Sequence, residues 1–226
     1  FFFDSKSGKY MYTGSSEVVP EKQVRESAQT LVTTGKFATQ ITNEAKFTTY
    51  QPERVNRMYN DYVNYVETVG ANIPADAAVL QTLRADLANG NIPQELTPEQ
   101  AAMFKRNIGD DFALLQSAYA NRDANNAQDK QQELLNALDA AESKVMYEYN
   151  YMTKMDAALE GDDYETAAKE YLTRDYVEKL VTDIGYSSVA SERKVDEWAI
   201  AKWKEAQDQR RHAAGTKKEN YIPFST

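Results

Sequence analysis

The chain of 226 residues contains no cysteine and only one histidine, His212. Without cysteine it forms neither disulfides nor thiolate zinc sites, and it has no thiol nucleophile. A single histidine also leaves no second imidazole or thiol from which to build a histidine-based catalytic pair. The absence of cysteine fits a virion-borne or exported protein, so we expect a virion or extracytoplasmic location rather than a cytoplasmic one.

Long apolar runs and clustered positive charge are missing too. No stretch approaches the run of about 18 apolar residues that a transmembrane helix needs, so we predict no membrane span in this chain. The formal net charge is −9. Nucleic-acid binding needs clustered Lys and Arg to neutralise phosphates, so we predict no nucleic-acid partner. The chain starts at Phe1 rather than Met, which suggests a processed or truncated N-terminus.

Glycine and proline are scarce, with 9 and 6 residues, and both fall mainly between periodic segments. This distribution is typical of an all-α protein whose chain breakers lie at helix ends. The sequence therefore predicts an irregular antiparallel helical bundle around one long central helix, with a small N-terminal β-hairpin and an extended C-terminal tail. We predict a hairpin arm over 1–14, a bundle domain over 15–214 and a tail over 215–226.

The central helix is predicted over 127–159, the longest uninterrupted helical pattern in the chain. Neither Gly nor Pro occurs there before Gly161. A helix of this length is roughly 50 Å long and needs other helices beside it. The predicted apolar stripe has intervals of three or four residues and consists of Leu134, Leu138, Ala141, Val145, Tyr149, Met152, Met155 and Leu159.

Shorter helices are predicted on both sides of the central one. The sharpest local signal is a capping box, in which Thr97 caps a helix that starts with Pro98 and Gln100 reaches back to the Thr97 amide. The pair Asp162 and Asp163 is expected to cap the helix that follows Gly161. The predicted helices span 20–34, 36–50, 52–70, 75–89, 97–108, 110–119, 162–184 and a segment after Ser188 that frays near Gln209.

The N-terminus carries two aromatic runs around a turn that contains Gly8. Phe1, Phe2 and Phe3 precede the turn, and Tyr10 and Tyr12 follow it. This pattern predicts a β-hairpin. A lone hairpin is marginal in water, so it should pack on the helical body or add strands to a partner. In the simpler alternative it is only a terminal clasp.

Tyrosine is unusually frequent, with 15 residues. Tyr147 and Tyr151 lie one helical turn apart on the central helix, and the tail carries Tyr221 and Phe224. Tyrosine combines a large apolar ring with a polar tip, which suits protein interfaces. The alternative is that the tyrosines form half-solvated margins of an ordinary helical core.

Two charged clusters have simple structural explanations. His212 lies beside Arg210 and Arg211, and such cations stabilise the C-terminal end of a helix, although a basic docking patch is an alternative. The acids around Asp162 and Asp163 lack the spacing of a calcium loop and suit a helix N-terminus. We therefore predict neither a metal site nor a cofactor.

Motifs of common enzymes are absent, including phosphate loops, dinucleotide fingerprints, metalloprotease helices and Gly-flanked nucleophilic serines. Two distant carboxylates can still meet in a fold, but we predict no catalytic residue and no enzyme. We expect a structural or adaptor subunit of a larger assembly, such as a virion or a cell-envelope complex, that binds protein partners as an oligomer or multi-subunit assembly. The alternative is a helical protein that binds a ligand or peptide in a tyrosine-lined groove. The predicted partner-binding residues are Phe1, Phe2, Phe3, Tyr10, Tyr12, Tyr147, Tyr151, Tyr221 and Phe224.

Overall fold

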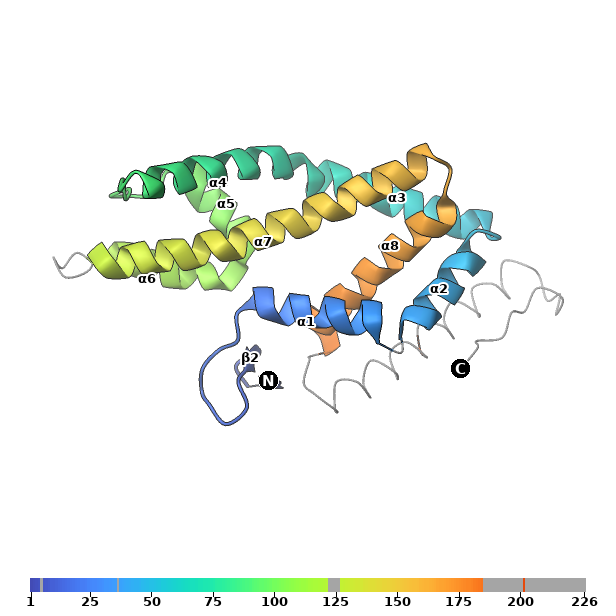
Figure 1. The fold of residues 1–226 in the computed structure, drawn as a ribbon, viewed down its shortest axis with the longest axis horizontal. Coiled ribbons are helices and arrows are strands. Elements are labelled where there is room, and N and C mark those ends of the chain that lie inside the picture. Colours follow the sequence, from blue (N-terminus) through green and yellow to red (C-terminus); the bar gives the residue numbers. More distant parts are fainter. Residues whose placement is uncertain (5, 36, 122–126, 185–200, 202–226) are drawn as a thin grey trace. The chain divides into compact units, whose positions relative to one another are not determined.

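The computed structural model describes residues 1–4, 6–35, 37–121, 127–184 and 201. In these residues the predicted all-α fold, the long helix and the N-terminal hairpin are confirmed (Figure 1). Apart from Ala201, the predicted last helix lies outside the described residues, and so does the tail. The strands are β1 (Phe2–Asp4) and β2 (Lys9–Met11). The α-helices are α1 (Glu21–Thr34), α2 (Phe37–Thr48), α3 (Pro52–Thr68), α4 (Ile73–Ala88), α5 (Pro98–Ile108), α6 (Phe112–Ala120), α7 (Ala127–Glu160) and α8 (Tyr164–Glu178).

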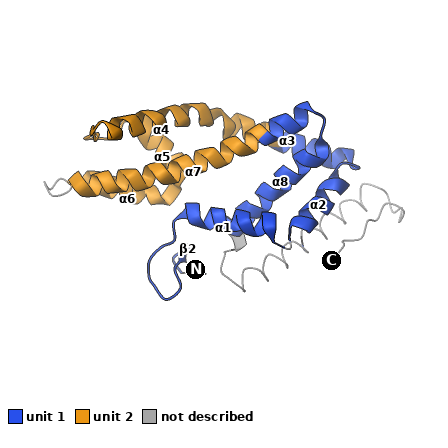
Figure 2. Ribbon diagram, in the orientation of Figure 1, with its two compact units in different colours: residues 1–61, 154–226 blue, residues 62–153 orange. Residues whose placement is uncertain are grey.

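The chain divides into two compact units (Figure 2). Unit 1 comprises residues 1–61 and 154–226, and unit 2 comprises residues 62–153. Helices α3 and α7 each contribute residues to both units. The predicted division at residues 14 and 214 stays a prediction.

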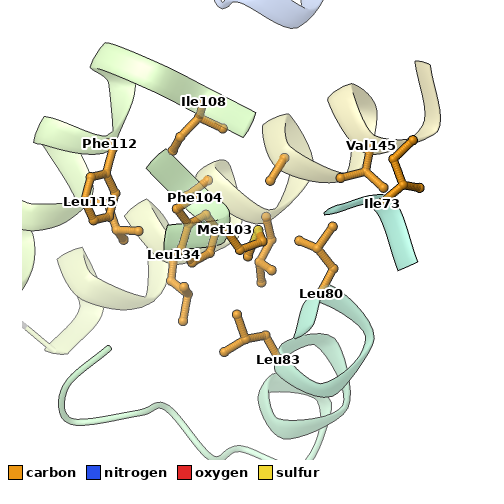
Figure 3. Packing of buried hydrophobic residues seen from close by; sticks show 13 residues of the cluster. Ile73, Leu80, Leu83, Met103, Phe104, Ile108, Phe112, Leu115, Leu134 and Val145 are labelled. Carbon is orange, nitrogen blue, oxygen red and sulfur yellow. The ribbon is translucent and has the colours of Figure 1, made fainter. Parts of the chain in front are cut away.

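Unit 2 is organised around an apolar core to which α4, α5, α6 and α7 contribute (Figure 3). Ion pairs support this core at its margins. Arg84 of α4 bonds Asp139 and Glu142 of α7, with 2.8 Å from Arg84 Nε to Glu142 Oε1. The core residues are Ile73, Leu80, Leu83, Met103, Phe104, Ile108, Phe112, Leu115, Leu134, Ala137, Leu138, Ala141 and Val145.

Unit 1 packs α8 against α1 and α2. Alanines at 167 and 168 are fully buried on α8, and their small side chains permit close approach of neighbouring helices. Arg25 of α1 is a buried cation held by two carboxylates, Glu21 on its own helix and Glu178 on α8. A buried charge is tolerated only when it is paired, so this pairing fixes how α1 meets α8.

Local helix signals were predicted well. The capping box is confirmed, because the Gln100 amide donates to Thr97 Oγ1 at 3.2 Å and the Thr97 amide donates to Gln100 Oε1 at 2.9 Å. Asp163 caps α8 by accepting from the Thr166 amide at 3.0 Å. The predicted helix over 162–184 is regular only to Glu178, since Lys179–Ile184 (η4) forms a wider π-helical turn.

The predicted stripe of the long helix is partly wrong. Leu134, Leu138 and Val145 are buried as expected, but Tyr149 is 48% exposed and Glu148 is only 4% exposed. From Val145 the next buried positions, Glu148 and Tyr151, follow steps of three residues, which rotates the buried side around the helix axis. In α3, Met58, Tyr62 and Tyr65 are buried, whereas Tyr59 and Val63 are exposed.

Candidate functional site

The N-terminal hairpin of unit 1 has a defined register. Its strands are antiparallel, with Phe2 opposite Met11, Phe3 opposite Tyr10 and Asp4 opposite Lys9. Successive side chains of a strand alternate between the two faces, and residues directly opposite each other share a face. Phe3 and Tyr10 therefore lie on one face, and Phe2 and Met11 lie on the other.

The face that carries Tyr10 is the anchored face. The Tyr10 ring meets the Phe1 ring at 6.0 Å and the Phe3 ring at 5.2 Å between centroids, in both cases edge-to-face. Tyr10 is 7% exposed. Its hydroxyl donates to the backbone oxygens of Leu180 at 2.6 Å and Val181 at 3.1 Å in η4.

Directly after β2, the Tyr12 hydroxyl lies 2.7 Å from Gln23 Oε1 on α1. The hairpin is thus tied to α1 and η4 within unit 1. The sequence left two roles open for the hairpin, which were packing on the helical body and adding strands to a partner. The face that carries Tyr10 packs on the helical body, because Tyr10 is buried there.

The turn between β1 and β2 is closed by Asp4. Its carboxylate accepts hydrogen bonds from the Lys6 amide, the Ser7 amide and the Ser7 hydroxyl, at 3.2, 3.1 and 2.7 Å. The Ser7 hydroxyl bond, followed by the Lys6 amide, lowers the pKa of Asp4 below its ordinary value. Gly8 adopts a left-handed conformation with φ +67°, which glycine tolerates without strain.

A third extended segment extends the sheet beyond the predicted hairpin. Met11 pairs antiparallel with Val18. The Val19 amide donates to Tyr10 O at 2.8 Å, and the Tyr12 amide donates to Glu17 O at 3.1 Å. Met11 is therefore flanked by Phe2 on one side and by Val18 on the other.

Phe2, Met11 and Val18 form an apolar line across the unanchored face of the sheet, which we call the outer row. Phe2 is 40% exposed and Val18 is 41% exposed, while Met11 between them is half-buried. Single exposed apolar side chains are ordinary, but three that neighbour one another on a fixed scaffold make a candidate contact surface. The outer row is the candidate functional site.

Sequence reasoning included Phe2 in the site but missed Met11 and Val18. The signal for Val18 was present, since Gly14, Ser15 and Ser16 predict a turn and two valines follow it. Gly14 does adopt φ +78°, and the Ser15 amide bonds Tyr12 O at 3.1 Å. The pair of valines was too short to be recognised as a strand.

The other predicted site residues lie apart from this surface. Phe1, Phe3 and Tyr12 are half-buried on the anchored face, and Tyr221 and Phe224 lie outside the described residues. Tyr147 is half-buried, with Lys144 Nζ at 5.3 Å from its ring centroid. Tyr151 is 7% exposed, so its ring is used for packing within unit 2.

Tyr151 belongs to a buried group with Tyr62 and Tyr65 that we call the tyrosine cluster. The ring centroids of Tyr65 and Tyr151 lie 4.9 Å apart, and those of Tyr62 and Tyr151 lie 6.1 Å apart. The Tyr62 hydroxyl donates to Met152 O at 3.1 Å. In this cluster the rings pack against one another, so these three tyrosines do not line an open groove.

Glu148 is a buried carboxylate next to the tyrosine cluster. The Tyr65 hydroxyl lies 2.9 Å from Glu148 Oε2 and 3.0 Å from Glu148 O, and Lys144 Nζ lies 3.0 Å from Glu148 Oε1. Both carboxylate oxygens are therefore bonded, as a buried charge requires. This arrangement joins α3 to α7 and explains the burial of Glu148.

In the described part of the chain, no three His, Asp or Glu side chains are grouped so that they could hold a metal ion. No described helix is long and apolar enough to cross a membrane. No family model, no curated protein and no solved structure matches the chain.

Proposed function

We propose that this protein is a non-enzymatic structural or adaptor subunit of a larger protein assembly, and that it binds a protein partner through the outer row. The observation that carries the proposal is the asymmetry of the hairpin. Tyr10 fixes one face to unit 1, and the opposite face presents Phe2 and Val18 to solvent. A fixed apolar row loses little conformational entropy when a partner covers it.

The size of the outer row suits the centre of an interface. Interfaces usually obtain most of their binding energy from a few apolar or aromatic side chains, surrounded by polar groups that exclude water. The exposed polar side chain on the same face is Lys9, two residues before Met11 in β2.

The roles of the charged residues support a non-catalytic function. Asp76 bonds Arg106 and accepts from Asn107 Nδ2 at 2.9 Å, and Arg25 is held by Glu178. These ion pairs join one helix to another. The buried Asp76 and Arg25 therefore each have a structural explanation that requires no substrate.

Size-exclusion chromatography with light scattering tests the proposal on the protein purified from its native source under mild conditions. The chain has a mass of 25.6 kDa. We expect the native protein to elute as a larger assembly, and the double variant Phe2→Ser with Val18→Ser to elute as the free chain. The matched control is Tyr50→Ser, which removes an exposed ring of unit 1 outside the hairpin.

The control should stay in the assembly. A native protein whose light-scattering mass equals that of its own single chain would contradict the proposal. So would a double variant that assembles like the parent, because the outer row would then make no contact that matters.

A further inference from the structure

The hydrogen bonds on one edge of β2 determine which backbone groups of β1 point outward. The Tyr10 carbonyl and the Tyr12 amide both bond the segment that contains Glu17 and Val19. Along a strand, backbone groups alternate between the two edges, so Lys9 and Met11 direct theirs toward β1. Their opposite residues, Asp4 and Phe2, consequently direct their own toward β2.

Phe3 is therefore the residue of β1 whose amide and carbonyl point away from β2. Two observations agree with this assignment. The rings of Phe3 and Tyr10 lie 5.2 Å apart, as suits a pair that exchanges no hydrogen bonds and whose side chains lie close together. The Gly8 amide donates to Asp4 O at 2.9 Å, so the Asp4 carbonyl faces the β2 side of the turn.

The outer edge of β1 is thus a short open sheet edge. Among the described residues, no backbone group outside β2 bonds the amide or the carbonyl of Phe3. Open edges are templates for another extended chain, and proteins often recognise peptides in this way. Added antiparallel to β1, a partner residue opposite Phe3 would exchange two hydrogen bonds with it.

Side chains at the edge restrict what can bind. The partner residue that lies next to Phe2 would share its face and lengthen the outer row, so an apolar side chain suits that position. The turn of the hairpin carries Lys6 and Lys9, both exposed and without an ion pair among the described residues. Asp4 offsets only one of these charges.

The positive charge of Lys6 and Lys9 at the turn favours a partner segment that is negatively charged. The turn is positive, whereas the whole chain has a formal net charge of −9. A second copy of the chain would bring the same net negative charge, which repels. An acidic segment of another protein is attracted by Lys6 and Lys9.

We propose that β1 binds its partner by strand addition, in which an extended, acidic segment of another protein, apolar at alternate positions, pairs antiparallel with the outer edge at Phe3. This inference rests on the proposed function, because the added strand would lie beside the outer row. It goes further by naming the backbone groups that bind and the chemistry of the segment.

Phe3→Pro is the decisive variant. Proline removes the outward amide at position 3 but no hydrogen bond between β1 and β2, and proline is tolerated on edge strands when its missing amide faces solvent. The matched control is Phe3→Ala, which also loses the ring but keeps the amide. Circular dichroism and the Tyr10 amide resonance verify that the hairpin forms in both variants.

The probes are three six-residue peptides. The first alternates Val and Glu, the second alternates Val and Lys, and the third is the first with alternate amides N-methylated, so that it cannot pair as a strand. Binding is measured by fluorescence anisotropy of labelled peptide, and pairing is measured as slower hydrogen exchange of the Phe3 amide.

We expect the Val-Glu peptide to bind and to slow exchange at Phe3, and the other two peptides to bind at least tenfold more weakly. Phe3→Pro should weaken binding roughly five- to tenfold relative to Phe3→Ala, as expected for loss of about one net backbone hydrogen bond. Lys6→Glu combined with Lys9→Glu should reverse the preference toward the Val-Lys peptide.

Three outcomes would overturn strand addition: equal binding of the N-methylated and the plain peptide, equal affinity of Phe3→Pro and Phe3→Ala, or protection of the Phe3 amide by self-association without peptide. Any of these outcomes would refute strand addition alone, provided that the double variant Phe2→Ser with Val18→Ser still elutes as the free chain. The proposed function would then stand. If peptide pairing occurs but the double variant keeps its assembly, the outer row as the assembly contact fails instead.

Discussion

The hairpin of unit 1 and the tyrosine cluster of unit 2 are built from the same kind of residue but use it in opposite ways. In the tyrosine cluster, Tyr62, Tyr65 and Tyr151 all turn their rings inward. In the hairpin, Tyr10 is buried and Phe2 on the other face is exposed. Aromatic content alone therefore does not distinguish an interface from a core.

The two regions differ in how completely other elements surround their aromatic rings. Two long helices contribute to the tyrosine cluster, and their side chains can surround each ring completely. The hairpin is a thin sheet that packs on the helices of unit 1 through one face only. Because the side chains of a strand alternate between its two faces, every second side chain of the hairpin points away from these helices. We expect changes in the tyrosine cluster and its unit to affect folding, and changes in the outer row to affect binding.

The largest effect is expected from placing a charge in the core of unit 2. Leu138 is fully buried, so Leu138→Asp would introduce an unpaired carboxylate and should destabilise the fold by more than about 4 kcal/mol. Urea titration followed by circular dichroism measures this loss. The control is Leu114→Asp, at an exposed position of the same unit, which should cost less than about 0.5 kcal/mol. Equal free energies of unfolding for the two variants would show that Leu138 does not lie in the core.

A smaller but still large effect is expected from the carboxylate beside the tyrosine cluster. Glu148→Ala leaves Lys144 without its ion-pair partner and removes one acceptor of the Tyr65 hydroxyl. Breaking such a buried pair should cost about 3 kcal/mol. Glu148→Gln keeps the size and one acceptor, so it should lose less. A loss below about 0.5 kcal/mol for Glu148→Ala in urea titrations would refute the structural role of this carboxylate.

The burial of Glu148 also shows where the sequence stopped being informative. Helix α7 could be predicted within one residue at its C-terminal end, because length, periodicity and absent chain breakers are local properties. Beyond Val145 the predicted stripe fails at Tyr149, although Met155 is buried as predicted. The burial of Glu148 and Tyr151 instead depends on Tyr62 and Tyr65 of α3. A charged residue that becomes buried through distant partners breaks the apolar periodicity on which the prediction relied.

The candidate site has the same limit. The hairpin follows from a local aromatic pattern around a glycine turn. The pairing of Met11 with Val18 depends on a third segment that has no periodicity of its own. The division of roles between the faces depends on the carbonyls of η4, which accept from Tyr10 across 170 residues of sequence. This second feature is therefore encoded far in sequence from the residues that it controls.

A moderate effect is expected where the hairpin is anchored. Tyr10→Phe removes the hydroxyl that donates to Leu180 O and leaves that carbonyl without this donor, so opening of the hairpin should become easier by about 1 to 2 kcal/mol. Hydrogen exchange of the Val19 amide, which bonds Tyr10 O, reports this opening. The control is Tyr12→Phe, whose hydroxyl bonds Gln23 at an exposed position and should change exchange only slightly. Unchanged exchange in Tyr10→Phe would show that the ring alone anchors this face.

The smallest effect is expected from acid at the turn of the hairpin. The pKa of Asp4 in the folded chain lies below its ordinary value of 3.8, because the Ser7 hydroxyl and the turn amides bond the ionised carboxylate. The ionised form is thus favoured by folding, and its contribution is complete above pH 3.8 and is lost as the pH falls through the lowered pKa. Exchange of the Ser7 amide, corrected for intrinsic rates, should therefore accelerate in acid in the parent. Asp4→Asn, which cannot titrate, should have a weaker turn at neutral pH and no such acceleration. Because Asp4 lies at the turn of the hairpin, hydrogen exchange of the Tyr65 and Tyr151 amides should be the same in the parent and in Asp4→Asn, so faster exchange of these two amides would contradict the separation of the outer row from the tyrosine cluster.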